Sequence, residues 1–207
     1  MKKLFALILV VAMAFSACGG QPAEKYPPQK MDFGGGDYSW HYFNDNGQRI
    51  KYEVFKKDVL TEIHYSEYDE AGNEIKDTVT DPDGNELKRD EITYENGKKT
   101  YMVRYRNGVI SLEDFFDENE NNYLSKLYED GVLYSWTESF YDEDNSATMS
   151  VGYRADGTVQ WMNEYSEDEN GNFVTQMSDF DENEELLKVV KRTSTKNGYK
   201  EEIIFEK

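Results

Sequence analysis

Three oxygen-bearing side chains, Asp81, Asp83 and Asn85, have the alternate spacing with which calcium-binding loops begin. Ca²⁺ takes carboxylate and amide oxygens as ligands, and the first, third and fifth positions of such a loop supply them. The pattern then fails, because the sixth position requires glycine and is Glu86, and the twelfth requires a bidentate glutamate and is Ile92. We therefore expect an ordinary hairpin turn at this position.

Acidic side chains also cluster in later turns, which motivates a looser calcium hypothesis. If these turns gather on one rim of the molecule, their carboxylates could bind Ca²⁺ weakly. Equal melting temperatures in calcium and in chelator would rule this out. The residues concerned are Asp117, Glu118, Asp142, Glu143, Asp144, Asp168 and Glu169.

The sequence offers little support for catalysis. His41 and His64 are the only two histidines, so one chain cannot build a three-histidine metal site, and we predict that each lies on a strand face. No G-x-S-x-G nucleophile turn, P-loop or G-x-G-x-x-G phosphate loop occurs. Among 42 acidic residues, a carboxylate pair at glycosidase spacing would arise by chance. We predict no enzyme, no cofactor and no metal, and keep a carbohydrate-active enzyme only as the least favoured class.

The aromatic surplus is the feature that most favours ligand binding. Aromatic residues make up 14% of the chain, and tryptophan and tyrosine rings can stack on a sugar or a peptide. The alternative, which we favour, is that the rings clamp neighbouring strands, since cross-strand aromatic pairs stabilise a sheet by about 0.2–1 kcal/mol each. The candidate ligand-binding residues are Trp40, Trp136, Trp161, Tyr134 and Tyr165, together with Tyr42.

The N-terminal residues have the pattern of a secretory signal. Met1-Lys2-Lys3 precedes an apolar run at residues 4–15 and small residues before Cys18, and this run is too short to span a bilayer of about 30 Å. The segment Phe15-Ser16-Ala17-Cys18 resembles the bacterial lipobox, which implies cleavage before Cys18 and thioether lipidation of its sulfur. The alternative is an ordinary signal peptide with a cysteine near its cut. Cys18 is the only cysteine, so the chain has neither a disulfide nor a second thiol.

The charge of the chain restricts its partners. Once residues 1–17 are removed, 21 basic side chains face 42 acidic ones, because Lys2 and Lys3 leave with the signal. Such a charge repels nucleic acid and anionic lipid head groups. We therefore predict no nucleic-acid partner, a membrane contact made through lipid on Cys18, and a location in the bacterial cell envelope outside the cytoplasm.

The elements that would position these residues are short strands. Asn-Gly and Asp-Gly pairs, which favour tight hairpins, recur with an aromatic residue before most turns at intervals of 11 to 13 residues. Between turns, aromatic or apolar residues alternate with polar ones, for example Tyr134 and Trp136 with Ser135 and Thr137. We predict an all-β antiparallel meander of about 14 strands, built from repeats of 12–13 residues as one twisted or rolled sheet that could close on itself. Glu120 stands where a turn glycine is expected, as does Asn145, so we predict longer or looser reversals there.

Three segments follow from these patterns. Residues 1–17 are the predicted signal peptide, residues 18–36 a lipidated flexible tether, and residues 37–207 the repeat domain. Three of the four prolines and a glycine triplet lie in the tether. The last predicted strand, Ile203-Ile204-Phe205, is flanked by charges that would protect an exposed sheet edge.

Two short stretches resemble known repeats. Residues 68–85, which begin Tyr68-Asp69-Glu70-Ala71-Gly72-Asn73, are similar to the YD repeats of bacterial Rhs proteins. Tyr94-Glu95-Asn96-Gly97-Lys98 resembles the variant MORN repeat of many bacterial lipoproteins and antitoxins. Both resemblances imply hairpin-built β-sheet arrays. We therefore expect a lipoprotein scaffold or binding module for a protein or glycan of the cell envelope, with an immunity or antitoxin-type protein that neutralises a basic toxin as the alternative.

Overall fold

The computed structural model describes residues 25–196 and 198–207, and within them it is all-β. The chain runs through consecutive antiparallel strands, each joined to the next by a hairpin. The strands are β1 (Gln29–Gly34), β2 (Asp37–Phe43), β3 (Arg49–Lys56), β4 (Val59–Tyr68), β5 (Glu74–Thr80), β6 (Glu86–Glu95), β7 (Lys98–Arg106), β8 (Val109–Phe116), β9 (Asn122–Glu129), β10 (Val132–Tyr141), β11 (Ala147–Arg154), β12 (Val159–Glu167), β13 (Phe173–Phe180), β14 (Leu186–Thr195) and β15 (Gly198–Glu206).

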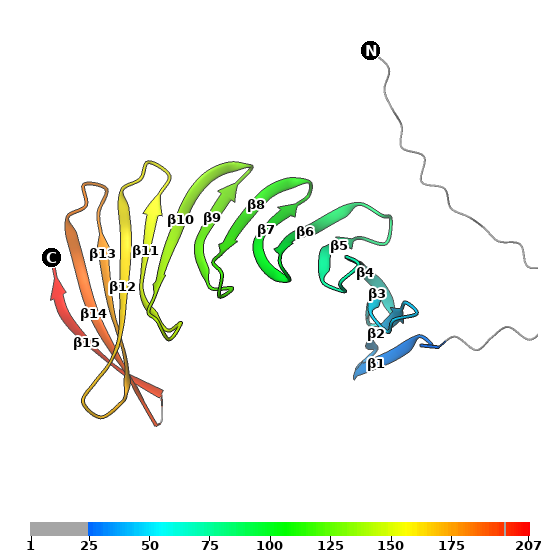
Figure 1. The fold of residues 1–207 in the computed structure, drawn as a ribbon, viewed down its shortest axis with the longest axis horizontal. Coiled ribbons are helices and arrows are strands. Elements are labelled where there is room, and N and C mark those ends of the chain that lie inside the picture. Colours follow the sequence, from blue (N-terminus) through cyan, green and yellow to red (C-terminus); the bar gives the residue numbers. More distant parts are fainter. Residues whose placement is uncertain (1–24, 197) are drawn as a thin grey trace, which may run out of the picture.

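These strands form one open sheet in sequence order. All 15 strands belong to it, and β1 and β15 are its two edges, so the sheet does not close on itself. Figure 1 shows them side by side along an arched ribbon, with no second layer on either face of the described residues. The backbone of each strand packs only against its sequence neighbours, which makes the fold quasi-one-dimensional. The predicted all-β antiparallel meander is confirmed.

The sheet begins earlier in the chain than the sequence indicated. Strand β1 lies within residues 18–36, the range predicted to be a tether, and pairs antiparallel with β2. The glycine triplet closes the hairpin between them, because Gly34, Gly35 and Gly36 all have positive φ, which glycine adopts without steric cost. The three glycines that were predicted to lie in a flexible tether are therefore turn residues.

The five-residue turns share one backbone hydrogen-bonding pattern, which residues 69–73 illustrate, and in all of them except the turn at 154–158 the side chain of the first residue accepts the amide of the fifth. The Gly72 amide donates to the Asp69 carbonyl (3.1 Å), and the Asp69 amide donates to the Asn73 carbonyl (2.9 Å). The Asn73 amide in turn donates to the Asp69 carboxylate (2.8 Å). The fourth residue of the turn has positive φ, and the first carries the accepting side chain, so the Asp-x-x-Gly pattern encodes both requirements.

The turns without this glycine have the same length and bonding pattern, so the prediction of longer or looser reversals is wrong. Glu120 adopts φ 63°, Asn145 φ 61° and Glu184 φ 61°. Left-handed backbone costs an L-residue about 1–2 kcal/mol. Two of the three residues form an added bond that offsets this cost: Glu120 Oε1 accepts the Lys99 amide (2.9 Å), and Glu184 Oε1 accepts the Val159 amide (2.8 Å).

β-Bulges interrupt the register of every neighbouring pair except β12–β13. In most hairpins the extra residue lies near the start of the second strand. Such a bulge bends the strand, increases its twist and redirects a side chain. The extra residues near the start of a second strand are Ile50, Thr61, Ile75, Leu87, Thr100, Ser111, Tyr123, Tyr134, Thr148, Gln160 and Leu187. The two others are Phe33 and Ile204.

Burial is shallow because the sheet has one layer. The buried apolar residues of the described chain are Val79, Val103, Val151, Val174 and Val189. Polar side chains cover much of the remaining backbone by pairing across strands.

A tyrosine–glutamate cluster on β7, β8 and β9 illustrates this pairing. The Tyr101 hydroxyl donates to Glu113 (2.6 Å) from one neighbouring strand, and the Tyr128 hydroxyl donates to Glu113 from the other. Burial, with the Glu113 hydrogen bond, raises the pKa of Tyr128 to about 12. Glu113 thus joins three strands across the face of the sheet without a second layer.

Candidate functional site

The aromatic residues predicted to form a stacking platform are not brought together. Trp40 lies on β2, far along the sheet from the others. Tyr134 and Trp136 lie on β10, and Trp161 and Tyr165 on β12. Trp136 pairs with Tyr153, whereas Trp161 pairs with Gly152, the next residue of β11, so the two tryptophans lie on opposite faces of the sheet.

Three of these rings clamp neighbouring strands. Trp136 stacks on Tyr153 with ring centroids 5.1 Å apart. Tyr165 stacks on Phe173 at 5.9 Å. The Trp161 ring lies directly over Gly152, where an added Cβ would stand only 2.2 Å from Trp161 Cε2. These contacts have the form of cross-strand clamps, which was the alternative favoured from the sequence.

Tyr134 differs from the others because it is the extra residue of the β9–β10 bulge. The register passes from Leu133 opposite Tyr128 to Ser135 opposite Leu127, leaving Tyr134 without a partner. Its side chain is 54% exposed. Tyr134 lines a hollow together with Leu127, the residue that pairs with Ser135. Tyr134 therefore shares the face of Ser135 and not that of Trp136. The strict alternation predicted for this strand is thus wrong at the bulge.

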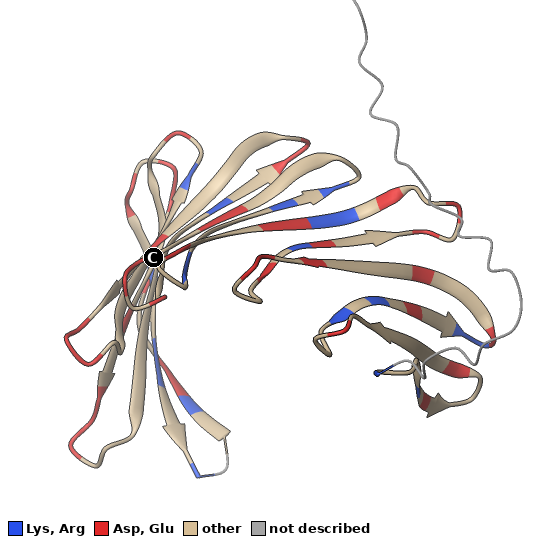
Figure 2. Ribbon diagram, turned by 45° about the vertical axis from the view of Figure 1, so that its right-hand side comes forward, with Lys and Arg blue, Asp and Glu red and all other residues tan. Residues whose placement is uncertain are grey.

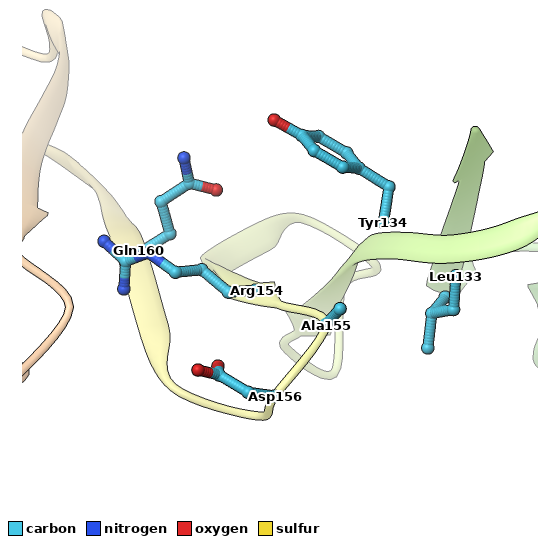
Figure 3. A pocket seen from close by; sticks show the side chains of 6 residues that line it. All are labelled: Leu133, Tyr134, Arg154, Ala155, Asp156 and Gln160. Atoms are coloured by element: carbon cyan, nitrogen blue, oxygen red, sulfur yellow. The ribbon is translucent and has the colours of Figure 1, made fainter.

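Tyr134 separates two shallow hollows. The first encloses about 390 Å³ between the start of β10 and the β11–β12 turn, and its lining includes Tyr134, Arg154, Asp156 and Gln160. Figure 3 shows the Tyr134 ring leaning over this space toward Gln160, with the Arg154 side chain extending toward Gln160 and Asp156 on the turn. The second hollow encloses about 360 Å³ on the other side of Tyr134.

A continuous cross-strand row connects the linings of the two hollows, since its β7–β9 residues line the second hollow and its β11 residue lines the first. Arg104 pairs with Leu112, Leu112 with Leu127, Leu127 with Ser135, and Ser135 with Arg154, from β7 to β11. Four strand spacings of about 4.8 Å place the two arginines roughly 19 Å apart. We call the surface formed by Arg104, Leu112, Leu127, Tyr134, Arg154 and Gln160 the Tyr134 groove.

The arginines of the groove are held in place by fixed acceptors. Arg104 forms a two-point ion pair with the buried Asp90 (2.8 and 3.0 Å). Arg154 donates to the Val159 carbonyl (2.7 Å) and the Phe180 carbonyl (2.6 Å). Burial raises the pKa of Asp90, but the hydrogen bonds from Arg104 and Lys88 outweigh it and leave that pKa below its usual value. The groove therefore presents rigid, planar hydrogen-bonding groups.

Charges around the groove are closely matched. Asp156 lines the first hollow near Arg154, and the Thr158 amide and hydroxyl, followed by the Arg154 charge, lower the pKa of Asp156. Glu129 and the exposed Arg106 line the second hollow, and Arg106 forms no ion pair with any residue that the structure describes. The groove thus lacks the strong negative charge of the chain as a whole.

Sequence reasoning named Tyr134 but missed its surroundings. Half of the six arginines line the two hollows, namely Arg104, Arg106 and Arg154. They are separated in the sequence, and only strand pairing brings them to one surface. A usable signal was the position of Tyr134 two residues after Val132, the first residue of its strand, because β4, β7 and β8 carry their bulge residue at the same position; that regularity is visible only once the register is known.

The two histidines form a stack with Tyr52. The Tyr52 ring lies between them, 5.4 Å from the His41 ring and 3.9 Å from the His64 ring. His64 Nδ1 is buried and has no hydrogen-bond partner. Burial lowers the pKa of both histidines. Because Tyr52 separates the rings, the stack is suited to holding strands together and not to binding one metal ion.

The acidic turns do not assemble a metal centre in the part of the chain that the structure describes, where no group of three potential ligands has suitable geometry. Asp81 forms an ordinary hairpin turn, accepting the Asn85 amide (2.8 Å) and side chain (2.7 Å). The turns at residues 117–121, 142–146 and 168–172 join alternate hairpins, so they lie at the same end of the strands, as the rim hypothesis requires. Their leading aspartates, however, accept backbone amides within each turn.

Comparisons with known proteins give no family. No protein-family model matches the chain, and no curated protein matches it. Among solved structures, a mutant of S. aureus TarM in complex with fondaparinux, alpha-GlcNAc-glycerol and UDP is similar over 64% of this chain and 21% of that one, at 8% identity and a TM-score of 0.29. The aligned part thus spans about a fifth of the TarM chain, and a likeness at this level carries no argument.

Two sequence predictions concern the membrane. Cys18, the predicted lipidation site, lies outside the described residues, as does the whole predicted signal peptide. Among the residues that were described, no helix has the length and apolar character needed to cross a bilayer.

Proposed function

We propose that the chain is a membrane-anchored lipoprotein of the bacterial cell envelope that presents its repeat sheet as a scaffold or binding surface for another macromolecule. Lipid on Cys18 would hold it at the membrane, and the sheet would face outward from the cytoplasm. The support for anchoring is the sequence Phe15-Ser16-Ala17-Cys18 after a basic start and an apolar run.

The observation that carries the binding role is the single layer. A sheet of 15 strands with two open faces exposes a long surface, and its hollows are shallow depressions between neighbouring hairpins. Enzyme sites are usually enclosed clefts that exclude water, which a single layer does not provide. Extended surfaces of this kind are how other repeat arrays bind their partners.

Two measurements test the proposal. Cells expressing the full chain, labelled with a fatty acid that carries a chemical tag, should incorporate the label into the wild type and not into Cys18→Ser, which should also leave the membrane fraction. The same full chain, immobilised on beads and incubated with envelope extract, should capture a defined macromolecule. A wild-type chain that carries no lipid and remains in the soluble fraction would refute the anchoring.

The alternative, an immunity-type protein that masks a basic toxin, is favoured by one observation. Asp and Glu gather at the turns, at both ends of the strands (Figure 2), so a basic partner would meet a dense row of negative charge there. The bead experiment separates the two roles. A single basic protein that is released by raised salt supports charge masking, whereas a partner whose retention does not depend on salt supports the scaffold.

A further inference from the structure

We propose that the Tyr134 groove binds a neutral glycan, with one sugar ring stacked on Tyr134 and its hydroxyl groups bonded to Arg154, Asp156 and Gln160. This inference deepens the proposed binding function and rests on it. It locates the binding surface on β7–β12 and names the chemistry of the ligand.

The exposure of Tyr134 is the first supporting observation. Rings that clamp the sheet, such as Trp136, lie flat against a neighbouring residue, whereas Tyr134 is 54% exposed and stands between two hollows. An exposed tyrosine offers a large apolar face at a small cost in side-chain entropy, because it has only two rotatable side-chain bonds. A ring-shaped ligand can lie against that face and extend into either hollow.

The position of the groove argues for a glycan over a peptide. Strands β7 to β12 are interior, so their backbone groups are already bonded to neighbours on both sides. A peptide commonly binds a sheet by adding a strand to a free edge, and here the free edges are β1 and β15. The groove offers side-chain donors and acceptors instead, which suits a ligand that carries many hydroxyl groups of its own.

The charges argue for a neutral glycan over an acidic one. Arg104 is paired with Asp90, Arg154 lies near Asp156, and Arg106 shares its hollow with Glu129. The chain as a whole carries a formal charge of −19, which repels a polyanion. Arg154 keeps its Nε–H and one Nη2–H beyond its bonds to Thr158, Val159 and Phe180, and Asp156 accepts within its turn through Oδ1 and so keeps Oδ2. With the Gln160 amide, these groups offer donors and acceptors to neighbouring hydroxyl groups.

The matched control is Tyr123. It is also the extra residue of a bulge, it is 44% exposed, and it lies on β9. Its bulge, however, lies at the other end of the strands, beside the β8–β9 turn, and its ring centroid is 6.5 Å from that of Phe115. The full chain, purified in detergent, is screened against neutral oligosaccharides of glucose, mannose, galactose and N-acetylglucosamine, with alginate and hyaluronate as acidic counterparts. The best ligand is then titrated calorimetrically against the variants.

We expect a neutral oligosaccharide to bind, and Tyr134→Ala to weaken it by at least about tenfold, or about 1.4 kcal/mol. Tyr134→Phe should retain binding because it keeps the ring, Gln160→Ala should weaken it, and Tyr123→Ala should leave it unchanged. Circular dichroism on each variant confirms that the sheet is intact.

The opposing outcomes are distinct. Glycan binding that survives Tyr134→Ala overturns the site and leaves the binding function standing. Binding only to acidic polysaccharides or to an acidic peptide overturns the proposed ligand. If no glycan binds while the bead experiment yields a protein partner, this inference fails alone, and if neither is found the binding function fails with it.

Discussion

The contact between Gly152 and Trp161 tests how a single layer is held together. An alanine Cβ at 152 would stand 2.2 Å from Trp161 Cε2 and 2.3 Å from Nε1. Ordinary carbon contacts are about 3.5–4.0 Å, so the ring would have to move outward by more than about 1 Å. We expect Gly152→Ala to lower the free energy of unfolding by about 1–3 kcal/mol, as overpacking does elsewhere. In urea, a loss of about 2 kcal/mol would lower the midpoint by roughly 1 M.

The double mutant gives this prediction its control. Trp161→Ala removes the ring, so an alanine at 152 then meets no obstacle. In that background Gly152→Ala should be neutral, or stabilising by about 0.5–1 kcal/mol, because glycine weakens a strand interior. Urea unfolding followed by circular dichroism measures the change, and hydrogen exchange shows whether it is confined to β11 and β12. An equal loss in both backgrounds would refute the ring-over-glycine reasoning.

Three further predictions concern a turn, the histidine stack and a buried ion pair. Gly84 has φ 88° with open space around it, so Gly84→Ala should lower the unfolding free energy in urea by about 1–2 kcal/mol from backbone strain alone, and an unchanged midpoint would contradict this. Burial depresses the pKa of His64 below 6.5, so the stability that its neutral form contributes is present above pH 6.5 and is lost as pH falls. The melting temperature should therefore drop between pH 7.5 and about 5.5, and His64→Gln should flatten this drop, whereas the same slope in the variant would point to other groups. Asp90→Asn removes the charge that partners Arg104 and should cost about 1–3 kcal/mol in urea unfolding; adding Arg104→Met should recover part of the loss, and no recovery would show that the pair is not coupled.

The fold class could be predicted from the sequence because its determinants are local. A residue such as Gly84 in an Asp-x-x-Gly turn carries its conformational preference with it, and alternation between turns requires only neighbouring residues. In a meander each strand pairs with the next one in the sequence, so no pairing between distant segments has to be predicted. The strand at Gln29–Gly34 was missed, because glycine-rich segments serve equally as tethers and as turns.

The candidate site could not be predicted beyond Tyr134, because it depends on register. A bulge shifts the pairing by one residue, and a shift of one residue moves a side chain to the other face. Tyr134 and Trp136 therefore face opposite ways despite their spacing, and Arg104 and Arg154 share a row only because the pairings of β7 to β11 connect them. Nothing in the local sequence marks those pairings.

The bulges also explain where a single-layer sheet can acquire a binding site. At four bulges the extra residue is a threonine or serine whose hydroxyl donates to a carbonyl of the neighbouring strand: Thr61, Thr100, Ser111 and Thr148. Those residues close the bulge with their own side chain. At Tyr134 the side chain forms no such bond, so the same backbone geometry projects an aromatic ring above the sheet. Because the backbone of each strand packs only against its neighbours, one repeat can change its bulge residue without altering the register of distant repeats. The bulge at Tyr134 would thus carry the proposed glycan site, and the Tyr134 and Tyr123 variants test that proposal directly.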